Sequence, residues 1–128
     1  MTTKHQILII EDEKDIIKLL DFNLSEEGYE INSLQAGTHA LETTLKLKPD
    51  IILLDLMIPG LDGFEVCKQL KSHANTKHIP IIILSAKTQE HTIITGLELG
   101  ADDYIVKPFS IHICKQFPRT RHIFSRSV

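Results

Sequence analysis

Three short runs of consecutive apolar residues constrain the fold of this chain more than any other feature. They cover residues 7–10, 51–54 and 81–84, and none of them alternates with polar residues. A strand with one face in water alternates apolar and polar side chains, whereas a strand buried on both faces does not. The runs therefore predict a parallel sheet that is covered by helices.

The segments between these runs have the spacing of amphipathic helices. Apolar residues recur at intervals of three and four in 13–27, 38–47, 62–72 and 89–99. Gly28 and Gly100 are expected to end the first and the last of these helices, and Asp62 to cap the third. Two further apolar segments, 29–33 and 104–106, are expected to be short strands.

The order of these elements predicts an α/β fold with a doubly wound, five-stranded parallel sheet. Strands that alternate with helices imply right-handed crossovers, and five strands favour the flavodoxin-like order 2-1-3-4-5. Such sheets bind ligands beyond the carboxyl ends of the first and third strands, where the strand order reverses. The segments after these two strands carry Glu11, Asp12 and Asp55.

Length and charge limit the class of protein. The 128 residues suit one domain, and no apolar run reaches the roughly 18 residues that a membrane span needs. The start of the chain has no signal-peptide pattern, so we expect a cytoplasmic protein with reduced cysteines. Residues 1–109 carry ten Lys or Arg and seventeen Asp or Glu, a balance of −7, whereas residues 110–128 carry four basic residues and no acid. An acidic body argues against direct binding to nucleic acid.

Polar side chains that suit phosphoryl chemistry follow four of the predicted strands. Glu11 and Asp12 follow the first, Asp55 the third, Ser85 the fourth and Lys107 the fifth. Like charges repel, so three carboxylates in one crevice call for a cation, and Mg²⁺ accepts a few carboxylates together with water and phosphoryl oxygens. The pattern indicates a magnesium-assisted site in which Asp55 accepts a phosphoryl group.

Four motifs resemble those of a response-regulator receiver domain. They are Ile-Glu-Asp-Glu at 10–13, Leu-Asp-Leu-Met-Ile-Pro-Gly-Leu-Asp-Gly at 54–63, Leu-Ser-Ala at 84–86 and Gly-Ala-Asp-Asp-Tyr-Ile-Val-Lys-Pro-Phe at 100–109. The resemblance covers residues 4–110 and implies a CheY-like fold. Residues 89–109 are similar in style to receivers of winged-helix (OmpR-type) transcriptional regulators.

The resemblance implies a role in two-component signalling. Asp55 would accept a phosphoryl group from the phosphohistidine of a sensor histidine kinase, and the chain would act as a phosphoacceptor with slow autodephosphorylation. Asp12, Asp55 and the backbone carbonyl of Met57 would bind Mg²⁺, and Glu11 would bind it through a water.

The same resemblance implies a switch and a partner surface. Ser85 would bond to the phosphoryl group, Lys107 would pair with it, and Tyr104 would turn inward behind it. The fourth helix, the fifth strand and the fifth helix would form the face of a homodimer or another partner.

The C-terminal residues 111–128 depart from this family. A short helix is expected to about residue 117, because Pro118 removes a backbone hydrogen bond and disfavours helical geometry before it. Two interpretations stay open: a native short helix with a basic end, or a frame-altered or artificially added end that leaves a receiver fragment with no output. In either case the homodimer would be weakened.

Two other functions are considered for the acidic site, and a separate interpretation is given for two later acids. A magnesium-dependent phosphohydrolase with an aspartyl nucleophile would need a general acid where Met57 stands. A flavodoxin-type cofactor site would need a phosphate loop where Glu11, Asp12 and Glu13 would repel the phosphate. Asp102 and Asp103 are interpreted as solvated loop residues.

Overall fold

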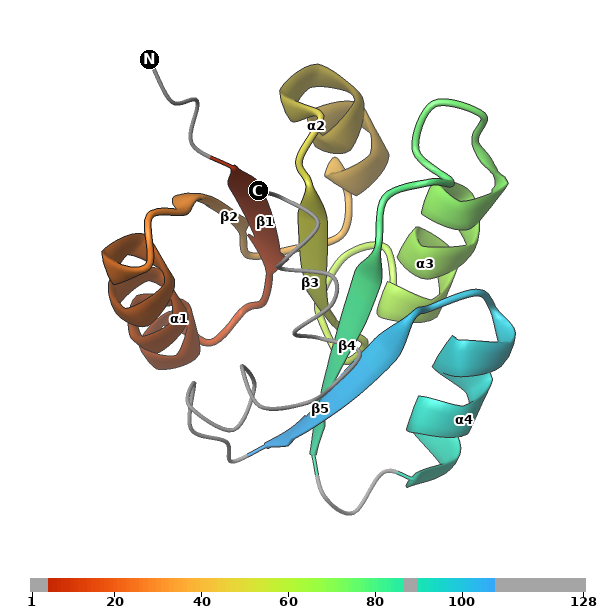
Figure 1. Cartoon of the computed structure of the whole chain (residues 1–128). Helices are drawn as coiled ribbons and strands as arrows, with labels where there is room; N and C mark the ends of the chain where they lie inside the picture. The colour runs from red at the N-terminus through yellow and green to blue at the C-terminus, as the bar shows by residue number, and fades with distance from the viewer. Residues whose placement is uncertain (1–4, 87–89, 108–128) are drawn as a thin grey trace.

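Five parallel strands form the centre of the molecule in the order β2-β1-β3-β4-β5 (Figure 1). The computed structural model describes residues 5–86 and 90–107. The strands are β1 (Gln6–Ile10), β2 (Glu30–Leu34), β3 (Ile51–Asp55), β4 (Ile81–Ala86) and β5 (Asp103–Lys107). The predicted α/β class and strand order are therefore confirmed, and the strand bounds differ from the expected ones by one or two residues.

Four helices connect the strands. They are α1 (Lys14–Glu26), α2 (Ala40–Leu47), α3 (Gly63–Ser72) and α4 (Glu90–Glu98). α3 begins where expected, because Asp62 Oδ1 accepts a hydrogen bond from the Glu65 N–H (3.0 Å). The chain leaves α1 through Gly28 at φ +95° and leaves α4 through Gly100 at φ +111°, a conformation that favours glycine.

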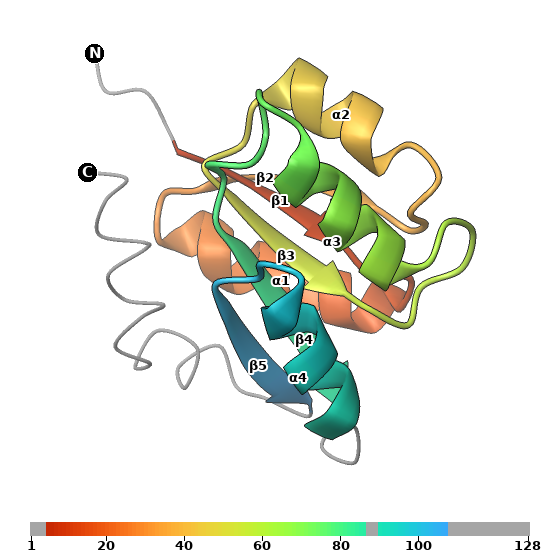
Figure 2. The ribbon, with the colours of Figure 1, turned by 90° about the vertical axis from the view of Figure 1, so that its right-hand side faces the viewer.

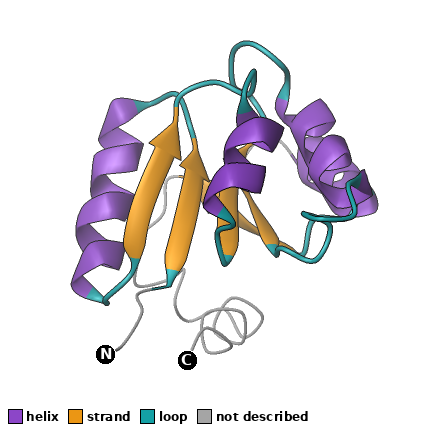
Figure 3. Cartoon of the chain, turned by 90° about the horizontal axis from the view of Figure 1, so that it is seen from above, coloured by secondary structure: helices purple, strands orange, loops and turns teal. Residues whose placement is uncertain are grey.

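Alternate strand residues point to opposite faces of the sheet, and each face is packed against helices (Figures 2 and 3). α1 contributes Leu20 and Leu24 to the cluster that contains Ile9 and Leu53. The opposite cluster takes its helical side chains mainly from α2 and α3. A continuous apolar run is therefore required in β1, β3 and β4, since both faces of these strands are buried.

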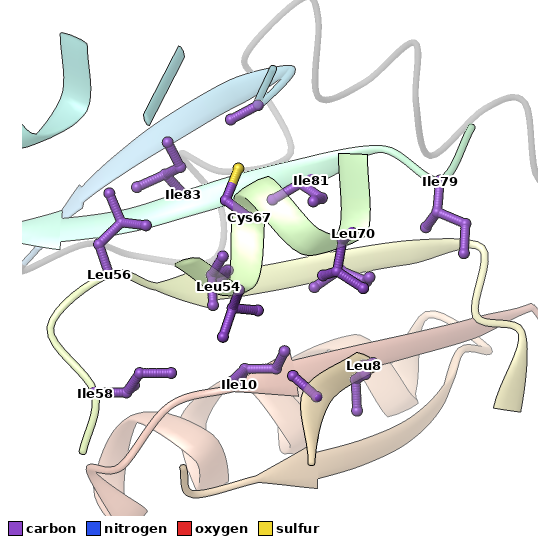
Figure 4. Close-up of a cluster of buried hydrophobic side chains, with 14 residues drawn as sticks. Leu8, Ile10, Leu54, Leu56, Ile58, Cys67, Leu70, Ile79, Ile81 and Ile83 are labelled. Atoms are coloured by element: carbon purple, nitrogen blue, oxygen red, sulfur yellow. The ribbon is translucent and has the colours of Figure 1, made fainter. Parts of the chain in front are cut away.

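The larger cluster lies between α3 and the sheet (Figure 4). Leu54 and Leu70 are fully buried there, and each buried side chain of this size contributes about 1.5–3 kcal/mol to folding. Cys67 lies in the same cluster as a free thiol, and burial raises its pKa to about 11. The expectation of a reduced cysteine agrees with this position.

The interpretation of Asp102 and Asp103 as solvated loop residues holds only in part: Asp102 lies in the loop before β5 and its side chain is 40% exposed, but it makes specific contacts. Asp102 Oδ2 accepts hydrogen bonds from Lys71 Nζ (3.0 Å) and from the Ile81 N–H (2.8 Å). Lys71 Nζ also donates to Ile79 O (2.8 Å). Asp103 is the first residue of β5 and is buried. The Lys71–Asp102 pair therefore joins the end of α3 to the starts of β4 and β5.

The C-terminal predictions fall outside the part of the chain that the structure describes. These are the end of the receiver region at residue 110, the short helix to about 117, and the tail 111–128. Between residues 5 and 107, leaving out 87–89, no helix is long and apolar enough to cross a membrane.

Candidate functional site

Three carboxylates gather at the carboxyl edge of β1 and β3. Glu11, Asp12 and Asp55 each offer an oxygen, and these oxygens lie within 4.8 Å of one another. The strand register explains this arrangement, because Ile10 pairs with Leu54. Glu11 and Asp55, which directly follow these two residues, therefore lie side by side. The structure brings together the three acids that the sequence singled out.

Glu11 and Asp12 differ in their surroundings. Glu11 is fully buried, which is rare for a carboxylate. Its N–H donates to Leu34 O (2.9 Å), which extends the β1–β2 ladder, and its Oε2 accepts from the Glu13 N–H (3.0 Å). Asp12 is exposed. The site thus has one carboxylate fixed inside the protein and one that faces solvent.

Asp55 is the last residue of β3 and is only 5% exposed. Its Oδ1 accepts a hydrogen bond from the Met57 N–H (2.9 Å), so the turn after the strand fixes the orientation of the carboxylate. Met57 itself is 58% exposed. A strand end followed by a tight turn therefore holds Asp55 at the edge of the sheet, beside the other two acids.

β4 and β5 bring the backbone of Ser85 and Lys107 to the same edge. Asp55 pairs with Leu84, which directly precedes Ser85. Lys107, the last residue of β5, pairs with Ala86, the last residue of β4. Tyr104 is the second residue of β5, near the opposite end of the strand, and is 37% exposed. The roles expected for these three side chains stay predictions.

The electrostatics of the acidic residues favour a bound cation. Three negative charges at this spacing repel one another, and burial of Glu11 strengthens the repulsion because the local dielectric constant is low. Carboxylate oxygens are hard ligands that suit Mg²⁺ or Ca²⁺. The residues present therefore fit a divalent metal ion.

Sequence reasoning missed one neighbour of this site. The Gly37 N–H, in the loop between β2 and α2, donates to Pro59 O (3.2 Å), in the loop that follows Asp55. A glycine in a short loop does not reveal which distant segment it touches. Only the folded sheet brings these two loops into contact.

Comparison with known proteins gives a family. The family model for the response regulator receiver domain matches residues 7–116. The Bacillus subtilis protein "Alkaline phosphatase synthesis transcriptional regulatory protein PhoP" is 48% identical over 105 residues, which are 82% of this chain and 43% of that protein. The chain thus spans less than half the length of this curated relative.

Solved structures agree with the fold. The chemotaxis response regulator CheY4 of Vibrio cholerae has a TM-score of 0.81 at 26% identity, over 98% of this chain and 100% of that chain. The receiver domain of a sensor histidine kinase from Pseudomonas aeruginosa has a TM-score of 0.84 at 26% identity, over 95% and 99%. That structure has a magnesium ion coordinated in its active site cleft. Together, the family match, the relatives and the acidic edge of the sheet show that the chain belongs to the response regulator receiver domain family of two-component systems.

Proposed function

We propose that Asp55 accepts a phosphoryl group from the phosphohistidine of a sensor histidine kinase in a reaction that requires Mg²⁺. The observation that carries this proposal is the position of Asp55 within 4.8 Å of Glu11 and Asp12, with its Oδ1 held by the Met57 N–H. A carboxylate held in this way meets an incoming phosphoryl group in a defined orientation. Membership of the receiver family supports the same role.

The transfer needs no general base, because a carboxylate is already a nucleophile. An oxygen of Asp55 attacks the phosphorus, and a P–O bond forms. The P–N bond to the histidine of the kinase breaks, and its electron pair stays on the imidazole nitrogen. The product is an aspartyl phosphate at the end of β3.

Asp12, Asp55 and the backbone carbonyl of Met57 are proposed to hold Mg²⁺, and Glu11 to hold it through a water. Bound Mg²⁺ neutralises the site and stabilises charge on the transferring group. Two oxygens on one Mg²⁺ lie at most about 4.2 Å apart, twice the usual bond length. The oxygens of the three acids lie within 4.8 Å of one another, which is compatible with binding to one ion either directly or through a water.

Ser85 and Lys107 are proposed to bind the phosphoryl group, and Tyr104 to change its position in response. The Ser85 hydroxyl would donate a hydrogen bond to a phosphoryl oxygen, and the Lys107 ammonium would neutralise another. Tyr104 is 37% exposed, and we expect it to turn inward once Ser85 has moved. The chain has no Trp and its other tyrosine is Tyr29, so in a Tyr29→Phe variant the tyrosine fluorescence would report Tyr104 alone.

Intact mass measurement tests the central proposal. The chain is incubated with Mg²⁺ and acetyl phosphate, and we expect a gain of one phosphoryl group that is absent in Asp55→Asn. Asp62→Asn is the matched control, because Asp62 lies at the same edge and asparagine also caps a helix. A folded wild-type chain that gains no mass, or an Asp55→Asn chain that gains as much as the wild type, would contradict the proposal.

Slow autodephosphorylation follows from the same site. A phosphohydrolase of the aspartyl type would use a general acid two residues after the nucleophile, and Met57 has no proton to transfer. We therefore expect the aspartyl phosphate to outlast removal of acetyl phosphate. A return to the unmodified mass within the dead time of sampling would favour the enzyme instead.

The output is proposed to lie with a partner. Ile94 of α4 is 56% exposed and Tyr104 of β5 is 37% exposed, which supports a homodimer or partner face over α4 and β5. The acidic balance of residues 1–109 supports the proposal that this chain does not bind DNA directly. A receiver fragment with no output remains the alternative. Size-exclusion chromatography with and without acetyl phosphate tests the homodimer, and a dimer that forms only with the phosphodonor would argue against the fragment.

A further inference from the structure

We propose that Gly37 is a positioning residue for the metal site, which it supports through the loop that carries Met57. The loop between β2 and α2 (35–39) would act as an outer support for the loop between β3 and α3 (56–62). This inference rests on the proposed Mg²⁺ site. It assigns a role at this site to the 35–39 loop, which supplies none of the expected metal ligands.

Two contacts join the loops. The Gly37 N–H donates to Pro59 O (3.2 Å). Gly60 has φ +80°, and a Cβ at that position would lie 2.5 Å from Thr38 Oγ1. The two loops are therefore closely packed at their glycines, although about twenty residues of chain separate them.

The approach at Gly37 leaves no room for a side chain. A Cβ there would overlap the carbonyl oxygen of Leu61 and would lie 2.8 Å from Val66 Cγ2. A backbone oxygen cannot rotate away as the end of a side chain can. Alanine at position 37 must therefore force the 35–39 and 56–62 loops apart. Gly37 does not have a positive φ, so alanine there causes a steric clash and no backbone strain.

Such a shift would reach the metal site through the neighbours of Met57. Leu56 and Ile58 are 2% and 7% exposed and anchor the loop in the core, while Met57 between them is 58% exposed (Figure 4). A Cβ at Gly37 would also lie 3.1 Å from Ile58 Cδ1. Metal–ligand distances tolerate errors of only about 0.2 Å, so a small displacement of this turn would weaken binding.

Linkage requires the effect to run in both directions. If the contact at Gly37 favours the loop geometry that binds Mg²⁺, then bound Mg²⁺ must favour the contact. We therefore expect Mg²⁺ to slow hydrogen exchange of the Gly37 N–H in the wild-type chain.

Isothermal titration of the full chain with MgCl₂, without a phosphodonor, tests the inference. We expect Gly37→Ala to raise the Kd for Mg²⁺ by about tenfold or more, the effect typical of residues that orient metal ligands. Gly28→Ala is the matched control, because Gly28 has φ +95° and a Cβ at that position would meet nothing within 4 Å, so the substitution strains the backbone without displacing a neighbour. Its Kd should equal that of the wild type.

The outcomes separate this inference from the proposed function. Equal Kd values for wild type and Gly37→Ala would overturn the inference alone, whereas a wild-type chain that binds no Mg²⁺ would overturn the metal site as well. Equal weakening in Gly28→Ala would show a general effect of lost stability and would also overturn it. If Gly37→Ala does not fold, hydrogen exchange of the Gly37 N–H decides: slower exchange with Mg²⁺ supports the inference, and unchanged exchange contradicts it.

Discussion

Charge is arranged in opposite ways at the two edges of the sheet. At the carboxyl edge, three groups of the same sign, Glu11, Asp12 and Asp55, lie within 4.8 Å of one another. At the amino edge, Lys71 and Asp102 form a pair of opposite sign at 3.0 Å, and the Lys71 side chain is 14% exposed. One edge neutralises its charge with its own residues, whereas the other concentrates a charge that a bound cation would neutralise.

This difference separates a structural ion pair from a binding site. The Lys71–Asp102 pair also makes hydrogen bonds to Ile79 O and the Ile81 N–H, so it closes the α3–β4 connection against β5. Repulsion between the three carboxylates is expected to lower the stability of the metal-free protein. Proteins retain such unfavourable clusters where binding requires them.

The largest expected effect comes from breaking the pair at the amino edge. Asp102→Ala would leave the Lys71 ammonium without its anion and the Ile81 N–H without its acceptor. We expect a loss of about 2 kcal/mol in the free energy of unfolding, discounted from the cost of a fully buried pair because Asp102 is partly exposed. Urea denaturation measures it, and a loss below about 0.5 kcal/mol would show that the pair contributes as little as a surface one.

Mg²⁺ should stabilise the carboxyl edge by a smaller amount. At ten times its Kd, a ligand that binds only the folded state adds about 1.4 kcal/mol. We expect this gain in the wild type and in Asp102→Ala, and its loss in Asp55→Asn. Thermal denaturation with and without MgCl₂ gives the comparison, and an equal gain in all three chains would place the ion elsewhere.

The smallest expected effect is a gain in stability at the acidic edge. Asp12→Asn removes one of three like charges, so without Mg²⁺ it should raise the free energy of unfolding by less than about 1 kcal/mol, since Asp12 is exposed and water screens it. Urea denaturation measures this gain, and added NaCl should reduce it, because salt screens the repulsion. A loss of stability in Asp12→Asn would mean that Asp12 makes a favourable contact in the apo state.

The sequence predicted the acidic edge better than the amino edge, for a physical reason. Continuous apolar runs fix the buried strands, and parallel strands place their carboxyl ends together, so Glu11 and Asp55 were expected to meet. Asp102 pairs with a lysine 31 residues earlier, and neither residue stands at the end of a predicted strand. Local pattern carries no information about such a pair.

The close approach of the two loops at Gly37 was unpredictable for a similar reason. A glycine in a loop permits many conformations, and only the packed structure shows that a neighbouring backbone excludes a side chain there. Asp62, by contrast, could be assigned its role from the sequence. Its role as a helix cap depends on residues three positions away, so the sequence was sufficient to predict it.

The buried thiol of Cys67 has a consequence for oxidative chemistry. With its pKa raised to about 11 by burial, the Cys67 thiol stays protonated near neutral pH, and the thiolate is the species that oxidants and electrophiles attack. The side chain is also fully buried between α3 and β4. Cys67 is therefore expected to react slowly with peroxide and with disulfides while the domain stays folded.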